Sequence, residues 1–148
     1  MAFKRRASRI VAMKALFAYE HHKEKVDKIF DFILTDGDLK LDDPEFAKGL
    51  IKGTIKHQKD ILAKIQEMAP AWPVEKIAPV DRAILEIGAF EILFSEDVPP
   101  VVAINEAIEI AKEFGDLNSA KFINGVLSSI MTKHCTYRDP KTGEYLKK

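Results

Sequence analysis

Apolar residues recur along most of this chain at steps of three and four, which is the period of an amphipathic helix and not the alternation of a half-buried strand. The pattern predicts one helix from about Lys4 to His22 and a second over residues 25–35. A third helix is expected to begin near Asp43, with a proline in its first turn. A fourth covers residues 61–68, either separate from the third or continuous with it.

The segment APAWPVEKIAP, residues 69–79, is the clearest internal boundary. Each of its three prolines lacks a backbone N–H and disfavours helix in the residue before it. Helical spacing resumes over residues 80–94 and, after Pro99-Pro100, over residues 104–111, where Gly115 is placed to end the helix. Two helical halves are therefore expected on either side of the proline-rich segment.

The last apolar stretch, SAKFINGVLSSI, contains Asn-Gly, a dipeptide that favours a hairpin between two strands. The apolar residues around it recur at helical spacing, so we predict a helix over residues 119–130. Glycine inside a helix costs about 1 kcal/mol relative to alanine. We therefore expect Gly125 to serve a close helix contact or a ligand near the backbone, and Gly88 to permit close packing.

No segment of the chain predicts a strand. The prediction is an all-α fold that forms one domain over residues 1–148, with one helical part at about 1–70 and another at about 74–135. A short basic tail over residues 136–148 is expected to be irregular.

Charge is balanced overall but unevenly distributed, with 23 Lys and Arg against 23 Asp and Glu. Residues 1–25 hold seven basic and two acidic residues, residues 26–132 hold eleven and nineteen, and residues 133–148 hold five and two. Basic ends suggest a polyanionic ligand, and an acidic body suggests a basic partner. The single cysteine allows no internal disulfide, and no apolar run suits a membrane span, so we expect no membrane association and a cytoplasmic location.

Catalytic chemistry has little support in the sequence. The four histidines show no metal-ligand spacing, and no phosphate-binding glycine loop or serine elbow is present, so we predict no enzyme activity, metal or cofactor. RNA binding is the function that the residue types still support. Basic residues lie near aromatic residues in the sequence, and single-stranded RNA is held by cations and by flat side chains on which its bases stack. The candidates are Lys4, Arg5, Arg6, Arg9, Phe17, Tyr19, Lys121 and Phe122. From this pattern alone, RNA binding and a purely structural role both stay open.

Three segments carry a resemblance to a known family: KRRASRIVAMKALFAYE, PVDRAILEIGAFEILF and VAINEAIEIAKEFGDLNSAKFINGVLSSI. With the spacing between them, they resemble the NusB family of bacterial transcription antitermination factors over residues 4 to about 134. The resemblance implies two perpendicular three-helix bundles. It also implies a heterodimer with NusE, a small-subunit ribosomal protein, that binds boxA single-stranded RNA in nascent transcripts, notably ribosomal RNA. In the transcription elongation complex, this assembly promotes read-through of terminators, and the free protein could form a homodimer.

The resemblance also implies roles for particular residues. The arginine-rich start of the family matches Arg5, Arg6 and Arg9, which are expected at RNA phosphates together with Lys4. The family's first-helix aromatic matches Phe17, and its KF motif matches Lys121 and Phe122, which are expected to form the rest of the RNA-binding surface.

This arrangement requires the start of the first helix to lie beside the last helix, with Gly125 allowing the close approach. On the acidic body, Asp81 is the expected contact for NusE. Two departures from the family suggest weaker RNA binding: Ala7 and Glu86 stand where several relatives carry arginine.

Two alternatives stay open. One is an RNA-binding module related to ribosomal RNA cytosine methyltransferases, without the catalytic domain, and the other is a helical protein-interaction scaffold. Salt-dependent binding of single-stranded RNA distinguishes the RNA-binding interpretations from the scaffold.

Overall fold

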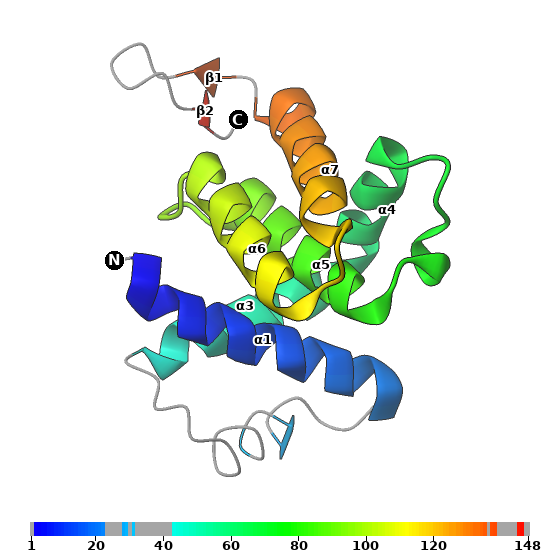
Figure 1. Cartoon of the computed structure of the whole chain (residues 1–148). Helices are drawn as coiled ribbons and strands as arrows, with labels where there is room; N and C mark the ends of the chain where they lie inside the picture. Colours follow the sequence, from blue (N-terminus) through cyan, green and yellow to red (C-terminus); the bar gives the residue numbers. More distant parts are fainter. Residues whose placement is uncertain are drawn as a thin grey trace.

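The computed structural model describes residues 2–22, 28, 29, 31, 43–135, 137, 138, 145 and 146. The helices are α1 (Ala2–His22), α3 (Pro44–Lys56), α4 (Gln58–Met68), the 3-10 turn η1 (Val74–Lys76), α5 (Pro79–Phe94), α6 (Pro100–Phe114) and α7 (Ser119–His134), shown in Figure 1. The predicted all-α fold is confirmed. The helix predicted at residues 25–35 falls mostly outside the described residues.

Prolines and one capping carboxylate fix where the central helices begin. Asp43 caps α3, because its Oδ1 accepts a hydrogen bond from the Phe46 backbone N–H at 3.1 Å. Pro44, Pro79 and Pro100 are the first residues of α3, α5 and α6, where the missing N–H is of no consequence. A turn at His57 separates α3 from α4, so the two predicted segments are distinct helices.

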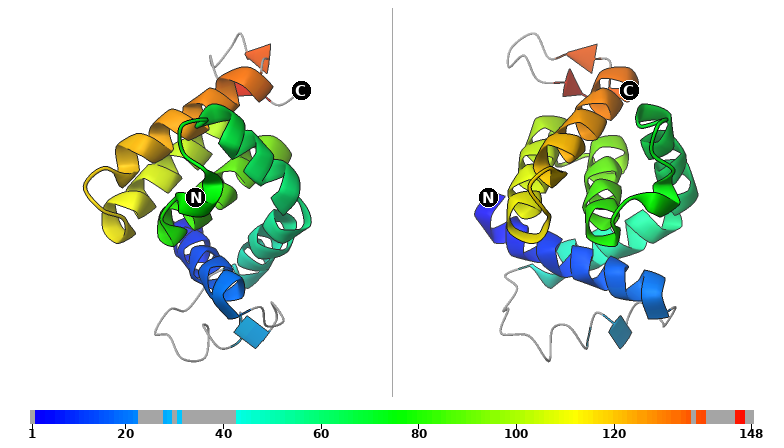
Figure 2. Two further views of the ribbon diagram at one scale, coloured as in Figure 1. Left: turned by 90° about the vertical axis from the view of Figure 1, so that its right-hand side faces the viewer. Right: turned by 45° about the vertical axis from the view of Figure 1, so that its right-hand side comes forward.

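Helix α5 is the centre of the molecule and packs against α1, α3, α4, α6 and α7. Helix α1 contacts α3, α5 and α6, whereas α7 packs on α4, α5 and α6. In Figures 1 and 2, α7 runs away from α1, with α6 between most of its length and the blue start of α1. Although α4 precedes the proline-rich segment, its main contacts are with α5 and α7, which follow that segment.

Glycines allow two close approaches in the interior. A Cβ added to Gly88 in α5 would lie 2.7 Å from Leu127 Cδ1 of α7, which confirms the expected close packing at Gly88. A Cβ on Gly53 in α3 would lie 2.3 Å from the Phe90 ring. Gly125 is exposed, and no atom of the described part of the chain lies within 4 Å of an added Cβ. The expectation that Gly125 admits the first helix is therefore wrong.

The tail contains a short antiparallel pair, β1 (Tyr137–Arg138) and β2 (Tyr145–Leu146). In its register, Tyr137 is opposite Leu146 and Arg138 is opposite Tyr145. The expectation of a wholly irregular tail is wrong for these residues. Within the described ranges, none of the helices combines the length and apolar character that crossing a membrane demands.

Candidate nucleic-acid interface

Arg9 lies in the interior, between α1, α5 and α6. Its side chain is 3% exposed, and its Nε and Nη2 donate hydrogen bonds of 2.8 Å to the two carboxylate oxygens of Glu91. Its Nη1 lies 3.6 Å from Oε1 of a second buried carboxylate, Glu106. Exposing Arg9 to a phosphate would leave both carboxylates buried without this cation, which is strongly unfavourable. The expected phosphate contact is therefore incompatible with the packing of Arg9.

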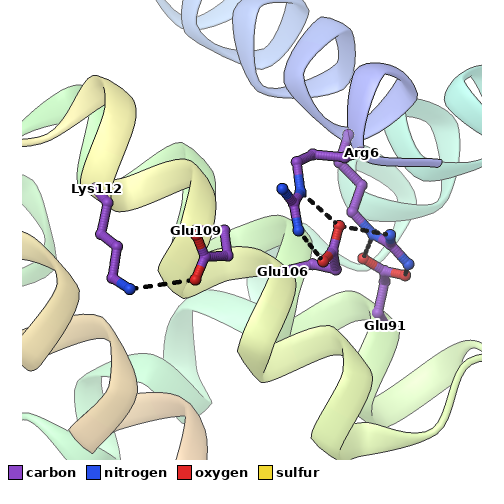
Figure 3. A network of polar contacts seen from close by, with 6 residues as sticks. Arg6, Glu91, Glu106, Glu109 and Lys112 are labelled. Carbon is purple, nitrogen blue, oxygen red and sulfur yellow. Dashed lines mark hydrogen bonds and ion pairs between the residues drawn. The ribbon is translucent and has the colours of Figure 1, made fainter. Parts of the chain in front are cut away.

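Arg6 faces the same group of carboxylates from one turn earlier in α1, as Figure 3 shows. Its Nε and Nη2 donate to Oε1 and Oε2 of Glu106 at 3.0 and 2.8 Å. This hydrogen-bonded pairing raises the pKa of Arg6 above its ordinary value. The Arg6 side chain is 30% exposed and Glu106 only 5%, so the guanidinium sits at the edge of a buried acidic site. Contact of Arg6 with RNA stays a prediction.

Arg5 is held more loosely. Its Nη2 lies 3.3 Å from an oxygen of the exposed Asp97, and its guanidinium stacks 4.3 Å from the ring centroid of Phe46. Exposed ion pairs of this kind contribute at most about 1 kcal/mol, so Arg5 can exchange its partner for a phosphate at small cost. Lys4 lies in α1, but its side chain is outside the described part of the chain.

The arginines at the start of α1 make side-chain contacts with α3, α5, α6 and the turn before α6. The expectation that the start of α1 lies beside the last helix is therefore wrong. The sequence could not show this, because the carboxylates that hold Arg6 and Arg9 are 100 and 82 residues away along the chain.

A different set of side chains forms the surface at the start of α7, called the α7 surface below: Trp72, Leu117, Lys121 and Phe122. Lys121 is exposed, and Phe122 packs edge-on against Trp72 with ring centroids 6.4 Å apart and planes at 71°. Trp72 is 56% exposed and Leu117 is fully exposed. The surface therefore combines a cation with accessible flat and apolar groups, as proteins that stack nucleobases do.

A hollow of about 300 Å³ opens beside Trp72 and Phe122 of the α7 surface. It is lined by Trp72, Lys76, Ile77, Ala78, Asp81, Asp116, Asn118, Ser119 and Phe122. Aromatic walls with a few polar groups are typical of sites that hold a flat ligand and fix its orientation. Because the exocyclic groups of a nucleobase both donate and accept hydrogen bonds, the lysine, amide and carboxylates of this hollow suit a base.

Asp81, the residue expected at NusE, lines this hollow. It is 9% exposed, and its Oδ2 accepts a hydrogen bond of 2.9 Å from Ser119 Oγ. Burial raises the pKa of Asp81, with the Asp116 charge adding to the effect and the Ser119 bond opposing it. Asp81 thus joins α5 to the start of α7, and its contact with a partner stays a prediction.

Two other features of the interface follow from the packing. Phe17 in α1 is 37% exposed, so it is available at the surface. Lys14, also exposed, places Nζ 5.5 Å from the ring centroid of Phe114 at the end of α6.

Sequence reasoning did not select Lys14 or Trp72. The signal for Trp72 was present, since a tryptophan between prolines in a connecting segment is expected at the surface.

Glu86 is buried and does not belong to this interface. It is 0% exposed, and its Oε1 accepts a hydrogen bond of 2.8 Å from Gln58 Nε2. Burial raises its pKa to about 7. The expectation that Glu86 weakens RNA binding by replacing a surface cation has no basis in its position.

Over the described residues, no group of three or more His, Cys, Asp or Glu side chains is placed to hold a metal ion.

The match to a protein-family model decides the affiliation of the chain. Residues 6–132 match the model of the NusB family. The chain belongs to the NusB family. It is 38% identical over 141 residues to the transcription antitermination protein NusB of Chloroflexus aggregans, and this match covers 94% of each chain.

Solved structures of NusB proteins have the same fold. A NusB structure from T. maritima superposes with a TM-score of 0.79 at 36% identity, covering 88% of this chain and 92% of that chain. A chain from a crystal structure of the antitermination factors NusB and NusE in complex with dsRNA superposes with a TM-score of 0.81 at 24% identity. That match covers 90% of this chain and 100% of the other, and at this identity it supports the fold alone.

Proposed function

We propose that this NusB-family chain is a non-enzymatic transcription antitermination factor that binds boxA-type single-stranded RNA together with NusE. Membership of the family supports the antitermination role, since relatives of nearly the same length carry that name. The observation that carries the RNA-binding part is the α7 surface, where the exposed Lys121 precedes Phe122 in the chain and the Phe122 ring packs on Trp72 at a hollow that both rings line.

The division of roles follows from exposure. Lys121 supplies a phosphate contact, and Trp72 and Phe122 supply stacking faces for bases. Arg5 and Arg6, with Lys4, contribute further phosphate contacts from the start of α1, and Phe17 adds an aromatic surface on the same helix. Arg9 is left out of this set because it is buried against Glu91.

A NusE-type ribosomal protein is the proposed protein partner, and a related fold is found in a NusB–NusE–RNA crystal structure. The acidic body of the chain suits a basic ribosomal protein. We propose Asp81 as one contact, assembly with the transcription elongation complex, and a cytoplasmic location, where transcripts and ribosomal proteins occur together. A homodimer of the free chain is part of the same proposal.

The test is a titration of boxA-type single-stranded RNA at several salt concentrations, with and without NusE. Each phosphate contact contributes about 0.7 to the slope of log affinity against log salt for a single strand. We expect Lys121→Gln to lower the slope by about this amount and Trp72→Ala to weaken binding by about 1–3 kcal/mol, since exposed rings stack bases.

Lys133→Gln is the matched control. Lys133 is on the same helix, twelve residues and therefore about 18 Å along the axis from Lys121, and its Nζ lies 3.1 Å from Glu67. This variant loses the same charge and should bind RNA as the unmodified chain does. Equal behaviour of the two lysine variants, or binding that ignores salt, would contradict the proposal and favour a protein-interaction scaffold.

A further inference from the structure

A second group of cations lies where α3 meets α4. Residues 46–59, FAKGLIKGTIKHQK, contain four lysines and no Asp or Glu, although the chain as a whole has equal numbers of basic and acidic residues. Lys48, Lys52 and Lys56 are each four residues apart on α3, so they follow one side of the helix at steps of about 6 Å. Lys59 follows in the first turn of α4.

The end of this row borders an open hollow of about 440 Å³, called the α3–α4 corner below. It is lined by Lys56, His57, Lys59, Asp60 and Ala63. Asp60 already accepts a hydrogen bond from Lys64 Nζ at 2.8 Å, so its charge is compensated. Lys56 and Lys59 are exposed and have no ion pair with any residue that the structure describes. Two uncompensated ammonium groups therefore face one hollow.

The ring of His57 gives this hollow a fixed flat wall. It stacks on Phe94 at the end of α5, with ring centroids 3.9 Å apart and planes at 10°. Phe90 extends the stack on the same side, at 6.4 Å from His57. Because the imidazole is held by two rings of α5, its orientation is set before any ligand arrives.

The α3–α4 corner is separate from the α7 surface. The corner adjoins Phe94 at the last turn of α5, whereas the hollow of the α7 surface is lined by Asp81 in the first turn. Thirteen residues of helix separate them, which is about 20 Å. A single nucleotide cannot bridge that distance, but an extended strand can.

We propose that the α3–α4 corner is a second RNA contact, where Lys56 and Lys59 bind backbone phosphates of a transcript that extends past the α7 surface. The inference rests on the proposed function and adds a second site to it. Lysine binds phosphate as a point charge without sequence preference, and the His57 ring offers a stacking face to an unpaired base.

The composition of the corner favours RNA over an acidic protein segment. Protein interfaces are built around an apolar or aromatic centre that is desolvated on binding. Among the described residues, the exposed large hydrophobic side chains are Phe17, Trp72, Val101 and Leu117. None of them lines the corner. Binding through the phosphate backbone depends on cations and needs no apolar centre.

The experiment compares two RNAs on the full chain: a short boxA-type strand, and the same strand extended at either end with uridines. We expect the unmodified chain to bind an extended RNA more tightly than the short one. The Lys56→Gln/Lys59→Gln variant should lose that gain while its affinity for the short RNA is unchanged. At about 0.7 per phosphate, its salt slope on the extended RNA should fall by about 1.4.

The matched control is Lys112→Gln/Lys133→Gln, which removes two lysine charges that already pair with Glu109 and Glu67. It should retain the tighter binding of the extended RNA. Circular dichroism checks that both variants stay helical, as expected for exposed glutamines.

Three results would overturn the inference: no gain from extending the RNA at either end, an unchanged gain in the Lys56→Gln/Lys59→Gln variant, or the same loss in both double variants. In each of these cases, binding of the short RNA still supports the proposed function. Failure of the unmodified chain to bind either RNA, with or without NusE, would overturn the proposed function and the second contact with it.

Discussion

The start of α1 holds four basic residues and residues 46–59, which lead into the α3–α4 corner, hold four lysines, yet the surroundings of the two groups differ. At the start of α1, Arg6 and Arg9 are held by buried carboxylates of α5 and α6. At the corner, Lys56 and Lys59 meet no acidic partner in the described residues and stay in solvent. A basic run in a sequence therefore leaves exposed, unpaired cations only where the fold brings no carboxylate to it.

A second contrast lies within α5 itself. Glu91 and Glu86 are both buried, and they are five residues apart on the helix. Glu91 receives a bidentate guanidinium, whereas Glu86 receives one amide hydrogen bond and has an Oε2 without a hydrogen-bond partner among the residues that the structure describes. The groups around each carboxylate, and not its residue type, therefore decide whether a buried negative charge is compensated.

The largest expected effect comes from removing the cation at the start of α1. Arg9→Met leaves Glu91 buried without its bidentate partner, which should lower the free energy of unfolding by about 3–5 kcal/mol. Chemical denaturation measures this loss. By contrast, Lys56→Gln at the corner should change stability by no more than about 0.5 kcal/mol, as surface substitutions do.

The double variant Arg9→Met/Glu91→Leu sharpens the comparison. It removes both members of the ion pair, so most of the stability lost in Arg9→Met should return. If Arg9→Met instead keeps its stability and loses RNA binding, then Arg9 belongs to the interface and the contrast between the two regions fails.

The next effect concerns the buried carboxylate without a cation. Burial raises the pKa of Glu86 from its ordinary value of 4.5 to about 7. The folded chain thus holds a proton that the unfolded chain releases, so stability falls as the pH rises from about 4.5 to 7, by about 3 kcal/mol in total. Glu86→Gln does not titrate and should be the more stable form at pH 8, with the advantage shrinking toward pH 4.5.

Melting temperatures of the two forms across this pH range provide the measurement. An advantage of Glu86→Gln that is the same at pH 5 and pH 8 would show that Glu86 is charged in the folded chain throughout.

The smallest effects distinguish the inner side of α7 from its outer side. Gly88→Ala forces a Cβ to within 2.7 Å of Leu127 on the inner side, and such overpacking costs about 1–3 kcal/mol. Gly125→Ala on the open side meets nothing within 4 Å and should stabilise the helix by up to about 1 kcal/mol. Unfolding midpoints in denaturant measure both. Destabilisation by Gly125→Ala would indicate that its backbone conformation matters, and that the outer side of α7 is not open.

Much of the fold was predictable because its helices depend on short segments of the sequence. The helical periods, the prolines at the starts of α3 and α5, and the family motifs all lie in short segments that specify their own structure. Phe122 and Lys121 were predicted at the interface from one such motif. Trp72 was not selected, although its place between prolines indicates an exposed ring; what the sequence could not show is its edge-on contact with Phe122, fifty residues away in the chain.

The sequence alone determined that this chain is all-helical, where most of its described helices begin, and that its motifs are those of the NusB family. Only the tertiary structure decided which cations are buried and which stay exposed, since Arg9 and Glu91 are 82 residues apart and meet through packing of α1 on α5. The physical reason is that helix formation depends on neighbours in the chain. The free energy of a charged side chain depends instead on the dielectric and the counter-charges that folding places around it.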